Sequence, residues 1–71
     1  MRPTAYQLWL YNISEGNANT LKHFIKQGLI EGNQATFDLC EEADVVDIDE
    51  LSLSDVTYYL IKKIERNEDK I

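Results

Sequence analysis

His23 and Cys40 are the only imidazole and thiol side chains in this sequence of 71 residues. One of each cannot build a tetrahedral zinc site without carboxylates from elsewhere in the fold. A Cys–His nucleophile pair would also need an orienting third group and a pocket, and so short a chain has little core from which to form one. We therefore interpret His23 as a partly exposed structural residue and Cys40 as a small apolar residue of the core.

Asp47 and Asp49 have the spacing of the first two ligands in an EF-hand calcium loop. Such a loop would place Ser52 at its sixth position, where glycine is needed, and Tyr58 at its twelfth, where a bidentate glutamate is needed. The sequence also lacks the G-x-S-x-G, H-E-x-x-H and phosphate-binding glycine motifs. We predict no metal site, no cofactor and no enzymatic activity.

The acidic side chains are concentrated in one quarter of the chain. Residues 38–55 carry eight carboxylates and no lysine or arginine, whereas 1–37 and 56–71 each carry a net charge of +1. The chain as a whole has a net charge of −6. This charge opposes binding to nucleic-acid phosphates and to anionic membranes, and it favours a partner with a basic surface.

Composition and length predict one small globular domain spanning 1–71. Hydrophobic residues make up 44% of the chain, which is too many for an intrinsically disordered sequence. The sequence has no apolar run long enough to span a membrane, no signal-peptide pattern and no second cysteine for a disulfide. We expect a cytoplasmic protein.

A helical hairpin is predicted for the first thirty residues, and its first helix spans 5–14. Thr4 and Gln7 have the T-x-x-Q spacing of a capping box, which favours this helix over the alternative of a strand from 6 to 13. Apolar side chains surround most of the segment, and four of them fall on one helical face: Tyr6, Trp9, Leu10 and Ile13.

The second helix of the hairpin begins after Asn17 or Asn19, either of which can cap it. Its apolar residues recur at helical spacing: Leu21, Phe24, Ile25 and Leu29. Gly28 is predicted to end it in the left-handed conformation, with Leu29 packing back on Phe24 as in a Schellman motif.

Residues 33–48 admit two interpretations. In the first, Asn33 caps a helix with Ala35, Leu39, Ala43 and Val46 along one face. In the second, 35–39 and 45–49 alternate as the two strands of a hairpin. Alanine and glutamate favour a helix over 34–43, and the V-V-D-I-D pattern favours extended chain after it.

The last predicted helix spans 53–67 and is capped by Ser52 or Ser54. Its apolar face is Leu53, Val56, Leu60, Ile61 and Ile64. The predicted fold class is therefore mainly α, a domain of three or four helices built on a helical hairpin, with a short β-hairpin between 35 and 48 as the alternative.

Residues 20–30, T-L-K-H-F-I-K-Q-G-L-I, are similar to the end of the recognition helix in MerR-like winged helix-turn-helix regulators. The resemblance implies that 35–48 forms the wing and that Lys22, His23 and Lys26 face DNA. It implies a DNA-binding transcriptional regulator or an antitoxin-like repressor, although acidic side chains in the wing would repel phosphates.

The charge distribution favours a different function, that of a small acidic regulator or inhibitor that binds a partner protein, for example a nucleic-acid-handling protein. The last helix adds an outer side of tyrosines and basic residues, which are common at interfaces. A third hypothesis is a homodimer formed through the aromatic first helix, which would supplement a small core. The candidate partner-binding residues are Asp38, Glu41, Glu42, Asp44, Asp47, Asp49, Glu50, Tyr58, Tyr59, Lys62 and Arg66.

Overall fold

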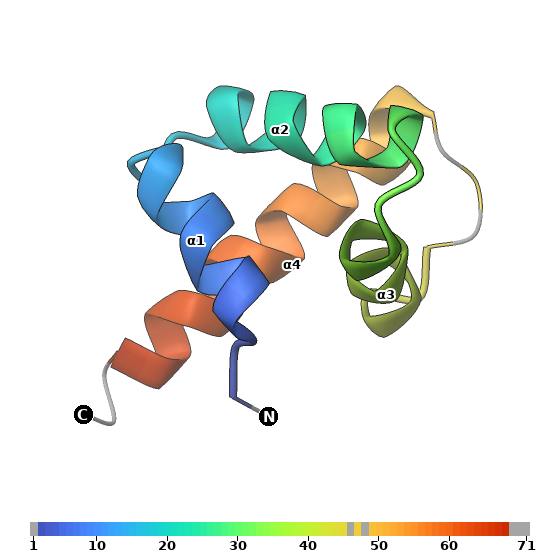
Figure 1. The fold of residues 1–71 in the computed structure, drawn as a ribbon. Coiled ribbons are helices and arrows are strands. Elements are labelled where there is room, and N and C mark those ends of the chain that lie inside the picture. The colour runs from blue at the N-terminus through green and yellow to red at the C-terminus, as the bar shows by residue number, and fades with distance from the viewer. Residues whose placement is uncertain (1, 46, 48, 69–71) are drawn as a thin grey trace.

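The computed structural model describes residues 2–45, 47 and 49–68 of the chain. It contains four helices, α1 (Ala5–Ile13), α2 (Ala18–Ile30), α3 (Gln34–Glu42) and α4 (Glu50–Glu68) (Figure 1). The described residues contain no strand. The prediction of a mainly helical fold is confirmed, and the alternative of a β-hairpin between 35 and 48 is wrong over the described part of that segment, where 34–42 is helix α3.

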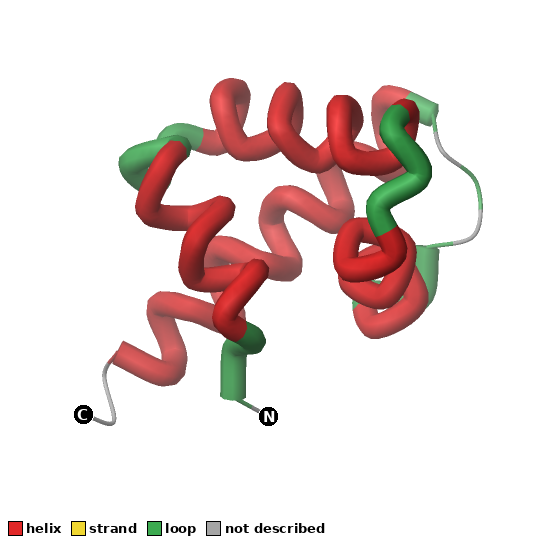
Figure 2. The backbone as a smooth tube through the Cα atoms, viewed as in Figure 1, coloured by secondary structure: helices red, strands yellow, loops and turns green. Residues whose placement is uncertain are grey.

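The long helix α4 is the element on which the others are assembled. Its most extensive contact is with α2, which runs across it, while α1 packs against both (Figure 1). Helix α3 packs against α2 on the other side of the molecule from α1 (Figure 2). The apolar face predicted for the last helix lies at the centre of this arrangement, and only Ile61 of that set is partly exposed. The buried apolar residues are Leu10, Leu21, Ile25, Leu29, Leu39, Cys40, Leu53, Val56, Leu60 and Ile64.

Helix α1 begins at the predicted capping box. The Gln7 amide donates to Thr4 Oγ1 at 3.1 Å, and the Thr4 amide donates to Gln7 Oε1 at 3.1 Å. Its predicted apolar face is only partly turned inwards, because Leu10 is buried whereas 54% of Trp9 is exposed. Apolar residues surround this helix, so periodicity could not select the buried side, and packing on α2 and α4 selects the side that carries Gln7 and Leu10.

Asn17 caps helix α2, and its side chain accepts a hydrogen bond from the Thr20 amide at 3.1 Å. The prediction that Gly28 ends this helix is wrong, because the helix continues to Ile30. Gly32 has a φ of +73° and is the left-handed residue that follows the helix. The Asn33 amide donates to the Gly28 carbonyl at 2.9 Å, as a Schellman motif one turn later requires.

Gly28 does not end the helix. Its lack of a side chain allows neighbouring helices to pack closely against it. A Cβ at this position would collide with Thr36 Oγ1 of α3 and would lie 3.1 Å from Tyr6 Oη of α1. The Tyr6 and Thr36 hydroxyls are themselves hydrogen-bonded at 2.5 Å. Gly28 therefore allows three helices to meet at one point, where no larger residue fits.

Helix α3 confirms the helical interpretation of 34–43 and its cap. The Asn33 side chain accepts a hydrogen bond from the Ala35 amide at 2.9 Å. The buried side of this helix is Thr36, Leu39 and Cys40, whereas Ala35 and Ala43 of the predicted face are only partly buried. The expected extended stretch after α3 includes residues 46 and 48, which lie outside the described residues.

Helix α4 begins at Glu50, three residues before the predicted start, and the predicted serine caps are wrong. Asp49 is the capping residue, because its Oδ1 accepts from the Ser52 amide at 2.7 Å and its carbonyl accepts from the Leu53 amide at 2.9 Å. Ser54 lies inside the helix and donates its hydroxyl to the Glu50 carbonyl at 3.1 Å.

Candidate partner-binding surface

The outer side of α3 and the chain that follows it present exposed carboxylates. Asp38 and Glu41 are one helical turn apart on α3, and both point outwards because the side at 36, 39 and 40 is buried. Asp44 and Asp47 follow, both exposed, and Asp44 adopts the left-handed conformation with a φ of +59°. We call Asp38, Glu41, Asp44 and Asp47 the acidic face.

No carboxylate of the acidic face forms an ion pair with a basic side chain of the described residues. Asp38 accepts one hydrogen bond, from Gln34 Nε2 at 3.0 Å, which leaves its charge uncompensated. The negative charge of the acidic face is therefore directed to solvent or to a partner.

Glu42, at the end of α3, is partly buried and is paired within the molecule, so it does not belong to the acidic face. Its Oε2 accepts from Lys63 Nζ at 2.5 Å and from Tyr59 Oη at 2.6 Å. Desolvation by burial alone would raise the pKa of Glu42, but the hydrogen bonds from Lys63 and Tyr59 and the charge of Lys63 outweigh it and lower the pKa. Glu42 is therefore ionised at neutral pH, and it joins α3 to α4.

This ion pair extends into a buried polar network that also includes α1. Lys63 is 8% exposed and donates a further hydrogen bond to Gln7 Oε1 at 2.8 Å. Burial, together with the hydrogen bond to Glu42 and the charge of Glu42, raises the pKa of Tyr59 to about 12. The sequence reasoning placed Tyr59 among partner-binding residues and did not anticipate the role of Lys63. The sequence does carry a signal for the burial of Lys63. It lies seven residues after Val56, so the two share one face of the helix.

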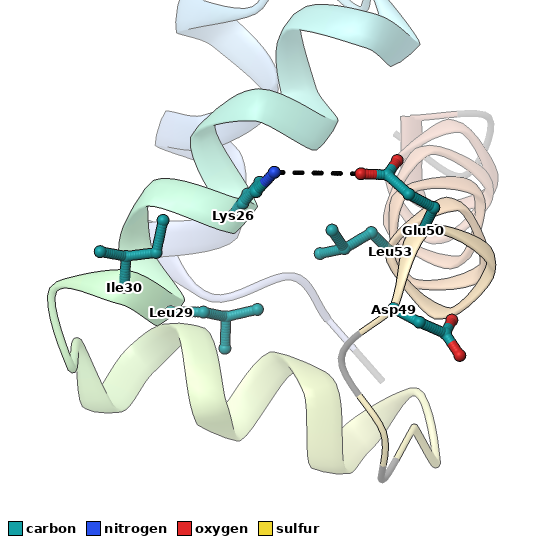
Figure 3. Close-up of a pocket in the computed structure, with 6 residues that line it drawn as sticks. All are labelled: Lys26, Leu29, Ile30, Asp49, Glu50 and Leu53. Atoms are coloured by element: carbon teal, nitrogen blue, oxygen red, sulfur yellow. Dashed lines mark ion pairs between the residues drawn. The ribbon is translucent and has the colours of Figure 1, made fainter.

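Glu50 is paired within the molecule. Its carboxylate lies 2.7 Å from Lys22 Nζ and 3.9 Å from Lys26 Nζ, and Figure 3 shows the second pair. The hydrogen bond from Lys22, followed by the charges of the two lysines, lowers the pKa of Glu50. Glu50 is 70% exposed, so these pairs contribute little to stability, but they compensate its charge.

Beside this pair lies an open groove of about 490 Å³ between the end of α2 and the start of α4 (Figure 3). Its apolar wall is formed by Leu29, Ile30 and Leu53, and its polar rim by Lys26, Asp49 and Glu50. The rim carries both signs of charge, so it does not favour a ligand of either sign.

The three residues implied in DNA binding lie on α2. Lys22 and Lys26 are engaged with Glu50, and His23 is exposed, with its ring edge-on to Phe24 at 5.9 Å. Residues 35–42, where the resemblance places the first part of a wing, lie in helix α3. The DNA-binding interpretation stays a prediction, and the packing of both lysines on an acidic residue does not favour it.

The outer side of α4 carries the remaining candidates. Tyr58 is 58% exposed, and Lys62 and Arg66 follow it at intervals of four residues, both exposed. They form a stripe of one tyrosine and two basic residues, whose positive charge is opposite in sign to that of the acidic face.

The described residues contain no group of three or more His, Cys, Asp or Glu side chains that could hold a metal ion. Cys40 is buried in the core as expected, and burial raises the pKa of its thiol. In the described part of the chain, no helix combines the length and apolarity needed to cross a lipid bilayer.

The chain matches no protein-family model, and comparisons with curated proteins and with solved structures found no significant similarity.

Proposed function

We propose that this protein is a small non-enzymatic regulator or inhibitor that binds a partner protein through the acidic face. The observation that carries the proposal is the division of the carboxylates between residues 38 and 50. Glu42 and Glu50 are each paired with lysine and Asp49 caps α4, whereas the four carboxylates of the acidic face are exposed and have no basic partner among the described residues.

Unpaired carboxylates on one short helix and the turn after it repel one another, so their arrangement does not serve the stability of the fold. The same arrangement produces a concentrated negative potential on one side of a chain whose net charge is −6. Such a potential accelerates encounter with a lysine- or arginine-rich surface and weakens as salt screens it.

A nucleic-acid-handling protein is the kind of partner that fits best. Its phosphate-binding surface carries the required density of positive charge, and an acidic protein seated there would compete with the nucleic acid. The proposal therefore predicts inhibition by occupancy of a basic groove, with no chemical step.

The test is capture of the partner from a lysate of the source cells with two matched triple variants. The first removes charge from the acidic face by Asp38→Asn, Glu41→Gln and Asp44→Asn. The second removes the same charge from exposed sites elsewhere by Glu15→Gln, Glu31→Gln and Glu65→Gln. Asparagine at 44 keeps a residue type that tolerates the left-handed conformation, so the first variant preserves the local backbone.

We expect the wild type and the second variant to capture the same protein in nuclease-treated lysate, with release at moderate salt. The first variant should lose it. Equal capture by both variants would contradict the proposal, because the acidic face would then contribute no more to binding than carboxylates elsewhere on the surface. Loss of the captured protein after nuclease treatment would indicate that nucleic acid mediates the contact, as the DNA-binding interpretation requires.

A further inference from the structure

A depression of about 170 Å³ lies between α1 and the end of α2. Three aromatic side chains line it, Tyr6 and Trp9 from α1 and Phe24 from α2. The ring centroids of Tyr6 and Trp9 are 6.0 Å apart, and their planes are inclined by 33°. We call this depression the aromatic pocket, and its other lining residues are Leu10, Gln27, Gly28, Glu31 and Asn33.

The aromatic rings are held in place without being covered. The Tyr6 hydroxyl is hydrogen-bonded to Thr36, which is fully buried, and Phe24 packs against the core. Trp9 nevertheless leaves 54% of its surface exposed, so it adds little to the core. Exposed aromatic surface on a small protein is typical of an interaction site, and walls that are already fixed lose little conformational freedom when a ligand binds.

The aromatic pocket carries negative charge that nothing in the described residues compensates. Glu31 is the only charged residue among those that line it, and it is exposed and forms no ion pair with a described basic side chain. The two lysines of α2 are engaged with Glu50 of α4 instead.

The position of Glu31 on its helix strengthens this negative potential. Glu31 is the C-cap of α2, where the helix dipole already places negative partial charge and where a basic residue would be stabilising. The last turn of α2 contains no basic residue, and α1 contains no charged residue at all. The Glu31 carboxylate therefore does not stabilise the helix that carries it, and its charge is available to a ligand.

Aromatic rings together with a carboxylate select a cation. The face of an aromatic ring carries negative partial charge and attracts a cation within about 6 Å of the ring centroid. A primary ammonium is strongly hydrated and loses that hydration against hydrocarbon walls, whereas a methylated ammonium presents methyl groups to them. The pocket is smaller than those of drug-sized ligands, which occupy roughly 300–1,000 Å³, and its size suits a single alkylammonium group.

We propose that the aromatic pocket binds a methylated ammonium group, which contacts the rings of Tyr6, Trp9 and Phe24 and pairs with Glu31. This chemistry is shared by small quaternary ammonium compounds and by methylated lysine side chains of proteins. The net charge of −6 also favours a cationic ligand. The pocket shares no residue with the acidic face, so this binding does not depend on the function proposed above.

Titration with tetramethylammonium chloride tests the proposal, with ammonium chloride at equal ionic strength as the control titrant. Trp9 is the only tryptophan in the chain, so its fluorescence reports on the pocket without a label. The NMR signal of the ligand methyl groups provides a second readout for variants that lack Trp9. The variants are Glu31→Gln, Trp9→Leu and, as the matched control, Glu65→Gln, which removes the same charge from an exposed site on α4.

We expect saturable binding of tetramethylammonium to the wild type at about millimolar concentration, and no saturable response to ammonium. Glu31→Gln should raise the dissociation constant about threefold or more, while Glu65→Gln leaves it unchanged. Trp9→Leu should raise it about threefold to fivefold, because one aromatic wall is lost. All three substitutions are at exposed positions, and far-UV circular dichroism checks that each variant is folded.

A lack of saturable binding of tetramethylammonium to the wild type would overturn the proposal. Equal responses to the two titrants, equal effects of the two glutamate variants, or an unchanged dissociation constant in Trp9→Leu would overturn it as well. A second titration compares choline with a short peptide that carries one trimethyllysine. Tighter binding of choline would identify a free small molecule as the source of the ammonium group, and tighter binding of the peptide would identify a modified protein.

Discussion

Gly28→Ala tests the packing of the three helices most directly. Helix propensity predicts that the substitution stabilises the fold, whereas the tertiary structure predicts that it destabilises the fold. Gly28 lies inside α2, where alanine is favoured over glycine by about 1 kcal/mol of helix propensity. The added Cβ, however, would collide with Thr36 Oγ1, which is fully buried and held by Tyr6.

The magnitude follows from the opposing contributions. Overpacking of a closed site costs about 2 kcal/mol, within a range of roughly 1–3 kcal/mol. Displacing Thr36 also disturbs its hydrogen bond with Tyr6, which contributes about 1 kcal/mol. Subtracting the propensity gain, we expect Gly28→Ala to lower the free energy of unfolding by about 2 kcal/mol.

Urea unfolding, followed by circular dichroism, measures this change, and a second background assigns its cause. Thr36→Ala removes the hydroxyl that the new Cβ would meet. Gly28→Ala should therefore lower the free energy of unfolding by less in that background than in the wild type. Gly32→Ala is the control, because no atom lies near its Cβ position and its cost, of about 1–2 kcal/mol, arises only from the φ of +73°. Stabilisation by Gly28→Ala, or an equal effect in both backgrounds, would refute the reasoning.

Three further predictions concern the buried groups. Because the pKa of Glu42 is lowered from 4.5, its contribution to stability is present above about pH 4.5 and is lost as pH falls through the folded-state pKa. Glu42→Gln should therefore cost roughly 2 kcal/mol at pH 7 and flatten the acid side of the stability profile, as urea titrations at several pH values would show. Because the pKa of Tyr59 is raised from 10.0 to about 12, its contribution to stability is full below about pH 10 and is lost as pH rises through the folded-state pKa of about 12. Phenolate absorbance should show a late-ionising component that is missing from Tyr59→Phe. Burial of Cys40 raises its pKa, so a thiol reagent should react with it slowly in the native protein and rapidly in urea.

The positions of the helices could be predicted from the sequence because their signals are local. A capping box spans four residues, and an apolar face needs only the spacing of residues within one helix. Thr4 with Gln7, Asn17, Asn33 and the Leu53 to Ile64 face were found in this way and are confirmed. The start of the last helix was misplaced because serines and aspartates near one another compete as caps, and local spacing cannot decide between them.

The candidate surface was predictable only in part. The sequence located the excess of carboxylates, but it could not separate Glu42 and Glu50, which are paired, from Asp38 and Glu41, which are not. That distinction depends on lysines brought from other helices. The spacing of Lys63 places it on the buried face of its own helix, but no local pattern identifies the carboxylate that it meets.

The amino-acid sequence by itself therefore determined the helices, most of their caps, most of the core and the location of the acidic segment. Tertiary structure alone decided the role of Gly28, the burial of Lys63 and the exposure of Trp9. The physical reason is the distance along the chain over which each feature forms. The contact of Tyr6 with Thr36 spans 30 residues and that of Gln7 with Lys63 spans 56, so both exist only when the helices have packed.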